Sequence, residues 1–251
     1  MGGTKILLQL EHEGRIARIT LNRPEKKNAL DFEMYGELTN TLQQAALDDN
    51  IIAVIVDSQV DSFTSGNDLG EFLAAPSISD ESPAPQFLKT LTTFPKILIA
   101  SVQGFAVGIG TTMLLHCDLI VAAKDSRFQL PFINLGLVPE AASSLLLPAR
   151  LGHCKASELL LFGEPFDAQT ALDLGLVNRV VDKHELETVV QEFSDKLLGK
   201  PKFALLETKR LLKVGSIDIH HHMNEEFKSF ATCLGTQEFK AAAEKFLKPK
   251  R

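Results

Sequence analysis

Two glycine-bearing segments have the residue types and spacing to stabilise a negatively charged oxygen. FTSGNDL at residues 63–69 follows an apolar run at 51–56, and GFAVGIG at 104–110 follows one at 97–102. A strand that ends in a glycine turn and leads into a helix leaves unpaired backbone N–H groups, which a ligand can approach closely. Two such turns on neighbouring strands could aim two donors at one oxygen, as in an oxyanion hole. The same spacing is also compatible with two ordinary strand-to-helix turns.

Glu140 is the acidic residue best placed for proton transfer. It lies in LGLVPEAASS, residues 135–144, between apolar residues and the start of an expected helix. A carboxylate in this position is either a helix-start residue that faces solvent or a partly buried acid with a raised pKa. The local sequence leaves both interpretations open.

Other catalytic and ligand-binding motifs are missing from the sequence. It contains no Walker A motif, no GxGxxG after a strand and no GxSxG elbow. Residues 220–222 are three consecutive histidines, but neighbours on a helix point about 100° apart and do not readily share one ion. We therefore expect no metal site.

The amino-acid composition limits the classes of protein to which the chain can belong. The chain has 251 residues, a net charge of −6 and 45% hydrophobic residues, as expected of a globular protein with one large or two small domains. Its acidity argues against a nucleic-acid partner. The three cysteines, Cys117, Cys154 and Cys233, are too few and too scattered for a disulfide framework.

The expected location is the cytoplasm, with no membrane partner. The N-terminal residues lack the apolar stretch of a signal peptide, and the final residues do not form a peroxisomal or ER-retention tripeptide. No window approaches 18 uncharged apolar residues, so the sequence predicts no transmembrane segment.

The elements that would position these groups form an α/β pattern. Strands are expected at 6–11 and 15–21, and continuous apolar runs at 51–56, 97–102 and 119–123 predict strands buried on both faces. Helical patterns between them indicate parallel α/β architecture. Asp31 is expected to cap a helix, and residues 76–85, rich in proline, are expected to form a surface loop.

The second half of the chain is mainly helical in pattern. Helices are expected at 157–162, 167–175, 183–198, 201–214 and 217–233, with one strand at 177–181. A helix-breaking junction at 199–201 suggests a division into 1–199, carrying the site, and a helical region at 200–251.

Taken together, the segments resemble the enoyl-CoA hydratase/isomerase (crotonase) superfamily. The likeness covers nearly the whole chain and depends on the order and spacing of its motifs. They are ITLNRP at 19–24, NAL at 28–30, the two glycine turns, CD at 117–118, AQTA at 168–171 and GLV at 175–177.

The resemblance implies a fold, a ligand and an assembly. The fold would be a crotonase-like spiral of ββα units with a C-terminal helical region that mediates trimerisation, giving a homotrimer or a dimer of trimers. The ligand would be an acyl-CoA thioester, and no cofactor is implied beyond the CoA moiety of the substrate.

The same resemblance assigns site residues. The thioester oxygen would lie between the backbone N–H groups of Asn67 and Ile109. The CoA nucleotide and pantetheine would lie along the following residues: Lys26, Asn28, Ala29, Ser65, Gly66, Asn67, Asp68 and Leu69. Lys26, with Lys27 and Arg23 near it, can supply local positive charge for phosphates.

The acids distinguish between family members. Hydratases of this family usually carry two glutamates, and the matching positions here are Thr112 and Phe132, neither of which can act as a carboxylate. Glu140 instead matches the single glutamate of the Δ3,Δ2-enoyl-CoA isomerase branch. The alternatives are another crotonase reaction that uses Glu140 alone, such as hydration, hydrolysis or dehalogenation, and a non-catalytic acyl-CoA-binding module.

Overall fold

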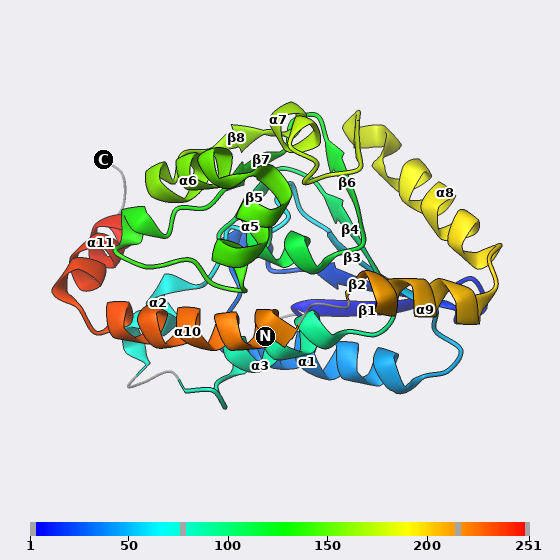
Figure 1. Ribbon diagram of the computed structural model, residues 1–251, viewed down its shortest axis with the longest axis horizontal. Helices are drawn as coiled ribbons and strands as arrows, with labels where there is room; N and C mark the ends of the chain where they lie inside the picture. Colours follow the sequence, from blue (N-terminus) through cyan, green and yellow to red (C-terminus); the bar gives the residue numbers. More distant parts are fainter. Residues whose placement is uncertain (1–3, 76–78, 214–216, 249–251) are drawn as a thin grey trace.

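The computed structural model describes residues 4–75, 79–213 and 217–248. A six-stranded sheet of order β1-β2-β3-β4-β6-β9 forms the centre of the molecule (Figure 1). Its strands are β1 (Ile6–Glu11), β2 (Ile16–Leu21), β3 (Ala53–Ser58), β4 (Ile97–Val102), β6 (Leu119–Ala123) and β9 (Arg179–Val181). Only the β1–β2 pair is antiparallel, since every other neighbouring pair in this sheet is parallel. The parallel α/β prediction is therefore confirmed for this sheet.

The central strands are buried on both faces, as their continuous apolar sequences predict. Val54 and Val56 belong to the large core cluster, whereas Ala53 and Ile55 pack in a second cluster on the opposite face. The second face is covered by α8 (Leu186–Leu198) and α9 (Lys202–Leu212), which contribute apolar residues to that cluster. Alternate residues of one strand thus pack in two different hydrophobic clusters, one on each face of the sheet.

Helices of the first half carry the turn segments. α1 (Phe32–Leu47) begins at Asp31, whose Oδ1 accepts the Met34 N–H at 2.9 Å, so the predicted cap is confirmed. The helices α2 (Leu69–Ala74) and α4 (Ile109–Thr112) begin in the last residues of the two glycine segments, and α4 tightens into a 3-10 turn at Met113–His116.

Two expectations for this half need correction. The surface loop expected at 76–85 is wrong at its end, because α3 (Pro83–Thr93) begins within it; proline at the first turn of a helix loses no needed donor. Residues 76–78 lie outside the described residues. The second glycine segment, expected to be a turn, contains the strand β5 (Phe105–Val107), and the helix after it begins at Ile109.

The short strand β5 belongs to a second sheet. It pairs with β7 (Arg127–Gln129), which pairs with β8 (Phe166–Asp167). A three-residue strand between glycines has too little pattern to be recognised in sequence, since its partners lie more than 20 residues away.

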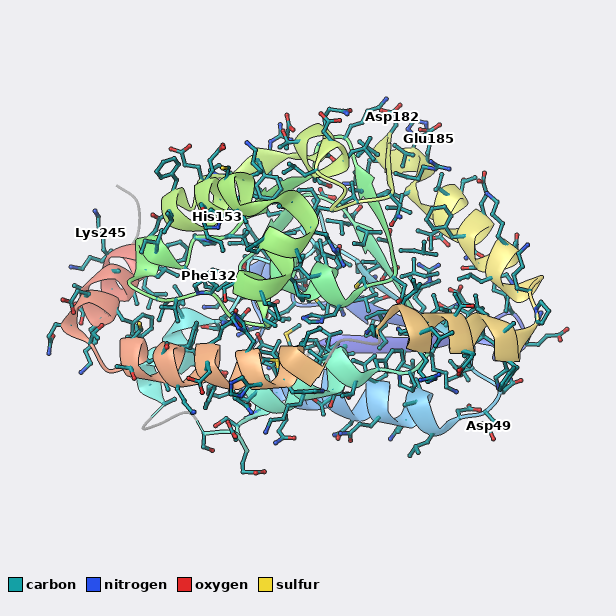
Figure 2. The ribbon with its side chains drawn as sticks, viewed as in Figure 1. Asp49, Phe132, His153, Asp182, Glu185 and Lys245 are labelled. Atoms are coloured by element: carbon teal, nitrogen blue, oxygen red, sulfur yellow. The ribbon has the colours of Figure 1, made fainter. Side chains whose placement is uncertain are left out.

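Three of the remaining helices match expected ranges with shifted ends: α6 (His153–Phe162), α7 (Ala168–Asp173) and α10 (Ile217–Leu234). α5 (Ser143–Leu151) is the helix expected after Glu140, and α11 (Gln237–Leu247) was not expected as a separate helix. Short 3-10 turns occur at Pro24–Lys26, Ile133–Leu135 and Lys183–Glu185. Asp182 and Glu185 form a capping box at the surface, directly before the first residue of α8, and both are labelled in Figure 2.

The C-terminal helices pack on the body of the protein. Met223 and Phe230 of α10, and Phe239 and Ala243 of α11, belong to the same core cluster as the strands. Figure 1 shows α10 crossing the molecule beside α2 and α3, with α11 at one end. The helical region expected at 200–251 therefore contributes to the surroundings of the site.

Candidate active site

The two glycine turns lie directly against each other. Thr64 N–H donates to the Phe105 carbonyl at 2.9 Å, and Val107 N–H donates to the Thr64 carbonyl at 3.0 Å. A side chain would be crowded between the turns, because a Cβ atom on Gly66 would lie 3.0 Å from the Val107 oxygen. These bonds bring together segments 40 residues apart.

Each turn presents one backbone donor of the predicted pair. Among the described residues, the N–H groups of Asn67 and Ile109 have no hydrogen-bond acceptor. The flanking groups are used: Asp68 N–H bonds to the Leu30 carbonyl, and the N–H groups of Thr111 and Thr112 bond to the Gly108 carbonyl. The turns therefore leave unpaired donors where the resemblance expects them.

Glu140 is joined to the helix that starts at Ile109. Its Oε1 accepts a hydrogen bond from the Thr112 hydroxyl at 3.0 Å. Ile109 and Thr112 are three residues apart on α4 and so lie on the same side of that helix. The carboxyl group is thereby bonded to the short helix whose first N–H group, that of Ile109, is unpaired.

The surroundings of Glu140 favour its neutral form. Burial raises the pKa of Glu140 to about 7, against the hydrogen bond from Thr112, which lowers it; the negative charge of Glu226 adds to the increase. A carboxyl with a pKa near neutrality can both accept and return a proton at physiological pH. Of the two interpretations of Glu140, the partly buried acid is confirmed.

Tyr35 is a member of the site that the sequence did not reveal. Its hydroxyl donates to the side-chain oxygen of Asn67, and its ring is almost fully buried. Burial, and after it the nearby Glu140 carboxylate, raise the pKa of Tyr35 well above its ordinary value. Tyr35 occurs at a helical core spacing in sequence, which gives no signal of a polar contact.

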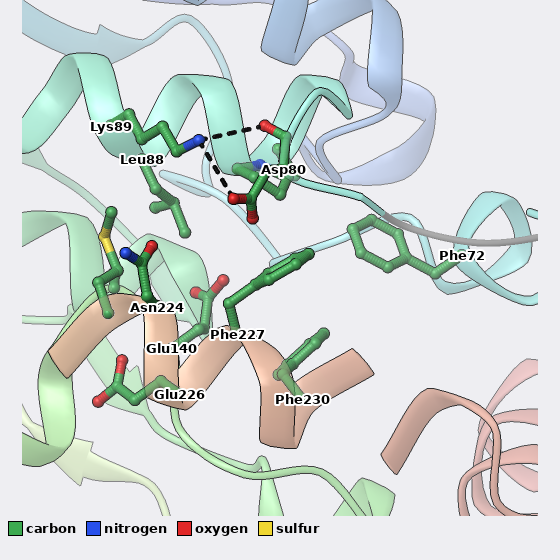
Figure 3. Close-up of a pocket in the computed structure, with 13 residues that line it drawn as sticks. Phe72, Asp80, Leu88, Lys89, Glu140, Asn224, Glu226, Phe227 and Phe230 are labelled. Carbon is green, nitrogen blue, oxygen red and sulfur yellow. Dashed lines mark hydrogen bonds and ion pairs between the residues drawn. The ribbon is translucent and has the colours of Figure 1, made fainter. Parts of the chain in front are cut away.

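Glu140 faces an apolar pocket that includes the C-terminal helix. Figure 3 shows its carboxyl group directed into the space between α3 and α10. The pocket holds about 540 Å³ of empty space, counted out to its open mouth. Its apolar lining comprises Phe72, Ala84, Pro85, Leu88, Ala141, Met223, Phe227 and Phe230.

Among the large apolar residues of α2 and α3, one from each helix lines this pocket and its neighbour in sequence does not. Phe72 and Leu88 line the pocket, whereas Phe87 is buried in the main core and Leu73 packs against that core. The contribution of α10 was not foreseen, because no pattern in the sequence shows which face of a late helix returns to the site.

The residues expected to line the CoA moiety differ in whether their side chains are exposed or buried. Lys26 is exposed, and Ser65 lies beside it with its hydroxyl bonded to the Lys26 carbonyl at 3.1 Å. Asn28 and Ala29 are buried, and the Asn28 amide group donates to the carbonyls of Ser62 and Phe63. Asn28 therefore braces the first glycine turn with its side chain.

The charged residues near this turn also differ, since some are engaged in ion pairs and others are exposed. Arg23 forms an ion pair with Asp68 at 2.9 Å, and Asp68 caps α2 by accepting the Gly70 N–H. Leu69 is the first residue of that helix. Lys27 lies 5.8 Å from the centre of the exposed Phe105 ring. Lys26 and Lys27, unlike Arg23, keep their charge available at the surface.

The two positions that match the hydratase acids are occupied as the sequence predicts. Thr112 is buried and directs its hydroxyl to Glu140. Phe132 is also buried and lies in the interior (Figure 2). Glu226 is a second carboxylate at the pocket, but both of its oxygens accept hydrogen bonds from Ala142 and Ser144.

Among the described residues, no group of three or more His, Cys, Asp or Glu side chains is arranged to hold a metal ion. His222, from the histidine triplet, instead contacts the Ser144 hydroxyl at 2.7 Å.

The sequence of the chain matches the enoyl-CoA hydratase/isomerase family over residues 11–248, and the protein belongs to that family. It is 37% identical over 220 residues to enoyl-CoA delta isomerase 2 of Rattus norvegicus, a match that covers 85% of this chain and 56% of the relative. It is 29% identical to the short-chain-enoyl-CoA hydratase of Clostridium acetobutylicum, covering 96% of this chain and 95% of the relative. The chain thus spans little more than half the length of its isomerase relative.

Solved structures support the fold assignment. An enoyl-CoA hydratase/isomerase from Pseudoalteromonas atlantica is 36% identical, with a TM-score of 0.92 over 99% of this chain and all of that one. The OdaA protein of Pseudomonas aeruginosa is 37% identical, with a TM-score of 0.94 over 98% of this chain and all of that one. The expected crotonase-like α/β fold with C-terminal helices is therefore confirmed.

Over the residues that the structure describes, we find no helix with both the length and the apolar character needed to cross a bilayer.

Proposed function

We propose that this protein is a Δ3,Δ2-enoyl-CoA isomerase that shifts the double bond of a 3-enoyl-CoA to the 2-position. The observation that carries the proposal is the Glu140 carboxyl group at the pocket, with a pKa of about 7. Asp80 also lines the pocket, but it is largely exposed and forms an ion pair with Lys89 at 3.7 Å. Glu226, the other glutamate there, has both oxygens engaged by the backbone.

In the proposed reaction, Glu140 removes a proton from Cα of the thioester. The electron pair moves through the C3–C4 double bond and the thioester carbonyl, which gives a dienolate with charge on the carbonyl oxygen. The N–H groups of Asn67 and Ile109 donate to that oxygen, and each such donor is worth about 2.7–4 kcal/mol in the transition state. Glu140 then returns the proton to Cγ, so the reaction needs no water or other reactant.

Substrate binding is proposed to follow the glycine turns. Lys26 and the turn from Ser65 to Leu69 would hold the CoA portion. Asn28 and Ala29 are buried and would support this turn from the interior of the protein. The acyl chain would enter the apolar pocket between α3 and α10, whose lining excludes water from the dienolate.

Hydration is less well supported by the same geometry. Addition of water needs one group to activate water and another to protonate Cα. Thr112 and Phe132 occupy the positions of the usual hydratase pair, so only Glu140 could serve either role. A panel of 3-enoyl, 2-enoyl and β-hydroxyacyl thioesters separates isomerisation from hydration, and CoA binding without any turnover would favour a non-catalytic module.

The proposed assembly is a homotrimer, or a dimer of trimers, in the cytoplasm. Exposed apolar side chains on the C-terminal helices support association, namely Phe203, Leu211, Leu212, Phe246 and Leu247. Light scattering on the purified protein measures the number of subunits.

The decisive experiment is the Glu140→Gln variant, assayed for the double-bond shift of a 3-enoyl-CoA. The amide keeps the shape and the Thr112 contact but cannot accept the proton, so kcat should fall by about 10²–10⁴-fold. KM should change little, because the amide leaves the binding surface intact. A loss of less than tenfold would contradict the role of Glu140.

A matched control is Glu238→Gln, an exposed glutamate on α11 that does not line the pocket. It should keep the activity of the original protein, since its charge lies in solvent.

A further inference from the structure

The turn that carries Glu140 has an unfavourable backbone conformation. Ala141 and Ala142 both have positive φ angles, +58° and +55°. For residues with a Cβ atom, this left-handed region costs about 1–2 kcal/mol each. Two consecutive alanines there need support from outside the turn.

The helix that follows the turn lacks a cap of its own. α5 begins after Ala142, whose methyl group offers no acceptor to the first backbone N–H groups. Alanine is among the poorer residues at this position, since the helix start leaves orphan donors. The local sequence therefore neither stabilises the turn nor caps the helix.

Glu226 supplies the missing acceptors from α10. One carboxylate oxygen accepts the Ala142 N–H at 2.6 Å, and the other accepts the Ser144 N–H at 2.9 Å as well as the Ser144 hydroxyl. The residue is buried, with 8% of its surface exposed. In all three contacts Glu226 is the acceptor, which favours its ionised form, whereas burial acts in the other direction and raises the pKa of Glu226 above its ordinary value.

We propose that Glu226 is a positioning residue for the reaction: from the C-terminal helix, it fixes the Ala141–Ala142 turn and so aims Glu140 at the substrate. The inference rests on the proposed function of Glu140. Its support is the set of contacts across 84 residues of chain between Ala142 and Glu226.

The charge of Glu226 acts on Glu140 in the same direction. It adds to the effect of burial in raising the pKa of Glu140. In Figure 3 the two carboxyl groups are seen apart from each other, with Glu140 directed into the pocket. Glu226 thus favours the protonated form of Glu140 while holding its backbone.

The other charged or titratable groups around this turn are few. Tyr35 of α1 stays neutral because burial raises its pKa, and burial lowers the pKa of His116 to about 4, so its ring is neutral while it donates to the Ala141 carbonyl. His222 of α10 contacts the Ser144 hydroxyl at 2.7 Å and lies 3.8 Å from a Glu226 oxygen, so its protonated form would favour ionised Glu226. Across the pocket, Lys89 of α3 forms an ion pair with Asp80 at 3.7 Å.

Two variants of Glu226 test the proposal in the full-length protein. Glu226→Ala removes all three contacts, and a displacement of Glu140 by about 1 Å should lower kcat by about 10²-fold. Glu226→Gln keeps the shape and one acceptor oxygen but removes the charge. It should lower kcat less and move the acid limb of the pH–rate profile to lower pH.

The matched control is Glu225→Gln on the same helix. Glu225 is exposed and pairs with Lys228, so the same change of charge occurs without contact to the turn. Its kcat should stay within about twofold of the original. Circular dichroism establishes that each variant is folded, and Glu226→Gln decides the question if Glu226→Ala does not fold.

A second measurement separates this proposal from the proposed reaction. Carbon-13 NMR of labelled glutamate carboxyls, with Glu140 assigned through Glu140→Gln, reports the titration of Glu140 without turnover. A lower pKa of Glu140 in Glu226→Gln shows that the Glu226 charge acts on Glu140, even if no 3-enoyl-CoA is isomerised, and the fall of kcat in Glu226→Ala then reports the positioning role. Folded Glu226 variants with unchanged kcat and an unchanged Glu140 titration would overturn it.

Discussion

The pKa of Glu140, and with it the ability to transfer a proton, depends on where its side chain lies in the fold. The same side chain at an exposed helix start would ionise near pH 4, but burial, with the charge of Glu226 adding to it, brings its pKa to about 7 against the hydrogen bond from Thr112. Proton removal and return by one group is most efficient when its pKa is close to the working pH. At this scale the site depends on desolvation of a single carboxyl group.

The pH dependence of activity should follow this pKa. The proposed base acts in its ionised form, so kcat/KM for a 3-enoyl-CoA should fall by about tenfold per pH unit below pH 7. An activity that stayed constant from pH 7 down to pH 5 would contradict Glu140 as the base.

The pH dependence of stability should have the opposite sign. Because the folded-state pKa of Glu140 is raised, its contribution to the free energy of unfolding is fully present below pH 4 and is lost as the pH rises through about 7. The loss is at most about 3 kcal/mol. Urea denaturation from pH 4 to 8 measures it, and the Glu140→Gln variant should show a smaller decline, since it has no proton to lose.

At the scale of elements, the site depends on two turns that touch. The backbone bonds between Thr64, Phe105 and Val107 hold the two turns together. The Asn67 amide lies in the turn before α2, and the Ile109 amide is the first of α4. Gly66 permits this approach, with a φ of +96° and the Val107 carbonyl close to where a Cβ would lie.

A Gly66→Ala variant should therefore separate the two turns. The new Cβ would lie 3.0 Å from the Val107 oxygen, and the positive φ adds strain. Misplacing one donor costs about 10²–10³-fold in kcat, which the 3-enoyl-CoA assay measures. Activity within threefold of the original in a folded variant would argue against the proposed donor pair.

Gly36→Ala is the corresponding control in α1. Nothing lies within 4 Å of the Cβ that would be added there. Alanine should raise the free energy of unfolding by about 0.4–1 kcal/mol, because it restricts the unfolded chain and favours the helix. Its activity should not change. A fall in the urea midpoint would contradict this expectation.

At the scale of the molecule, the C-terminal helices complete the site. α10 provides part of the pocket wall and the Glu226 carboxylate, while α11 packs Phe239 into the main core. The boundary expected near residue 199 stays a prediction, but packing across it couples the stability of the tail to that of the site.

Phe239→Ala tests this coupling. The ring is 1% exposed, so its loss should lower the free energy of unfolding by about 3–5 kcal/mol. Lys240→Ala, an exposed neighbour on α11, should change it by less than about 0.5 kcal/mol. Urea denaturation followed by fluorescence of the single Tyr35 and by circular dichroism measures both. A separate early transition for the tail would show that the helical region unfolds as its own domain.

The local sequence was sufficient to predict much of the secondary structure. The continuous apolar runs predicted β3, β4 and β6, because a strand buried on both faces needs apolar residues throughout. Asp31 was recognisable as a cap by its side chain alone. The order of motifs, including Glu140 and the two glycine turns, was enough to indicate the family.

Contacts between distant segments were decided only by the tertiary structure. The bond from Tyr35 to Asn67, the wall formed by α10 and the three contacts of Glu226 each join residues that no local pattern relates. β5 and the start of α3 were missed for a similar reason, since proline and glycine signal loops unless a distant partner or a helix start accommodates them. The sequence thus determined which groups the protein carries, while packing determined how they are desolvated and held, because burial and long-range hydrogen bonds exist only in the folded chain.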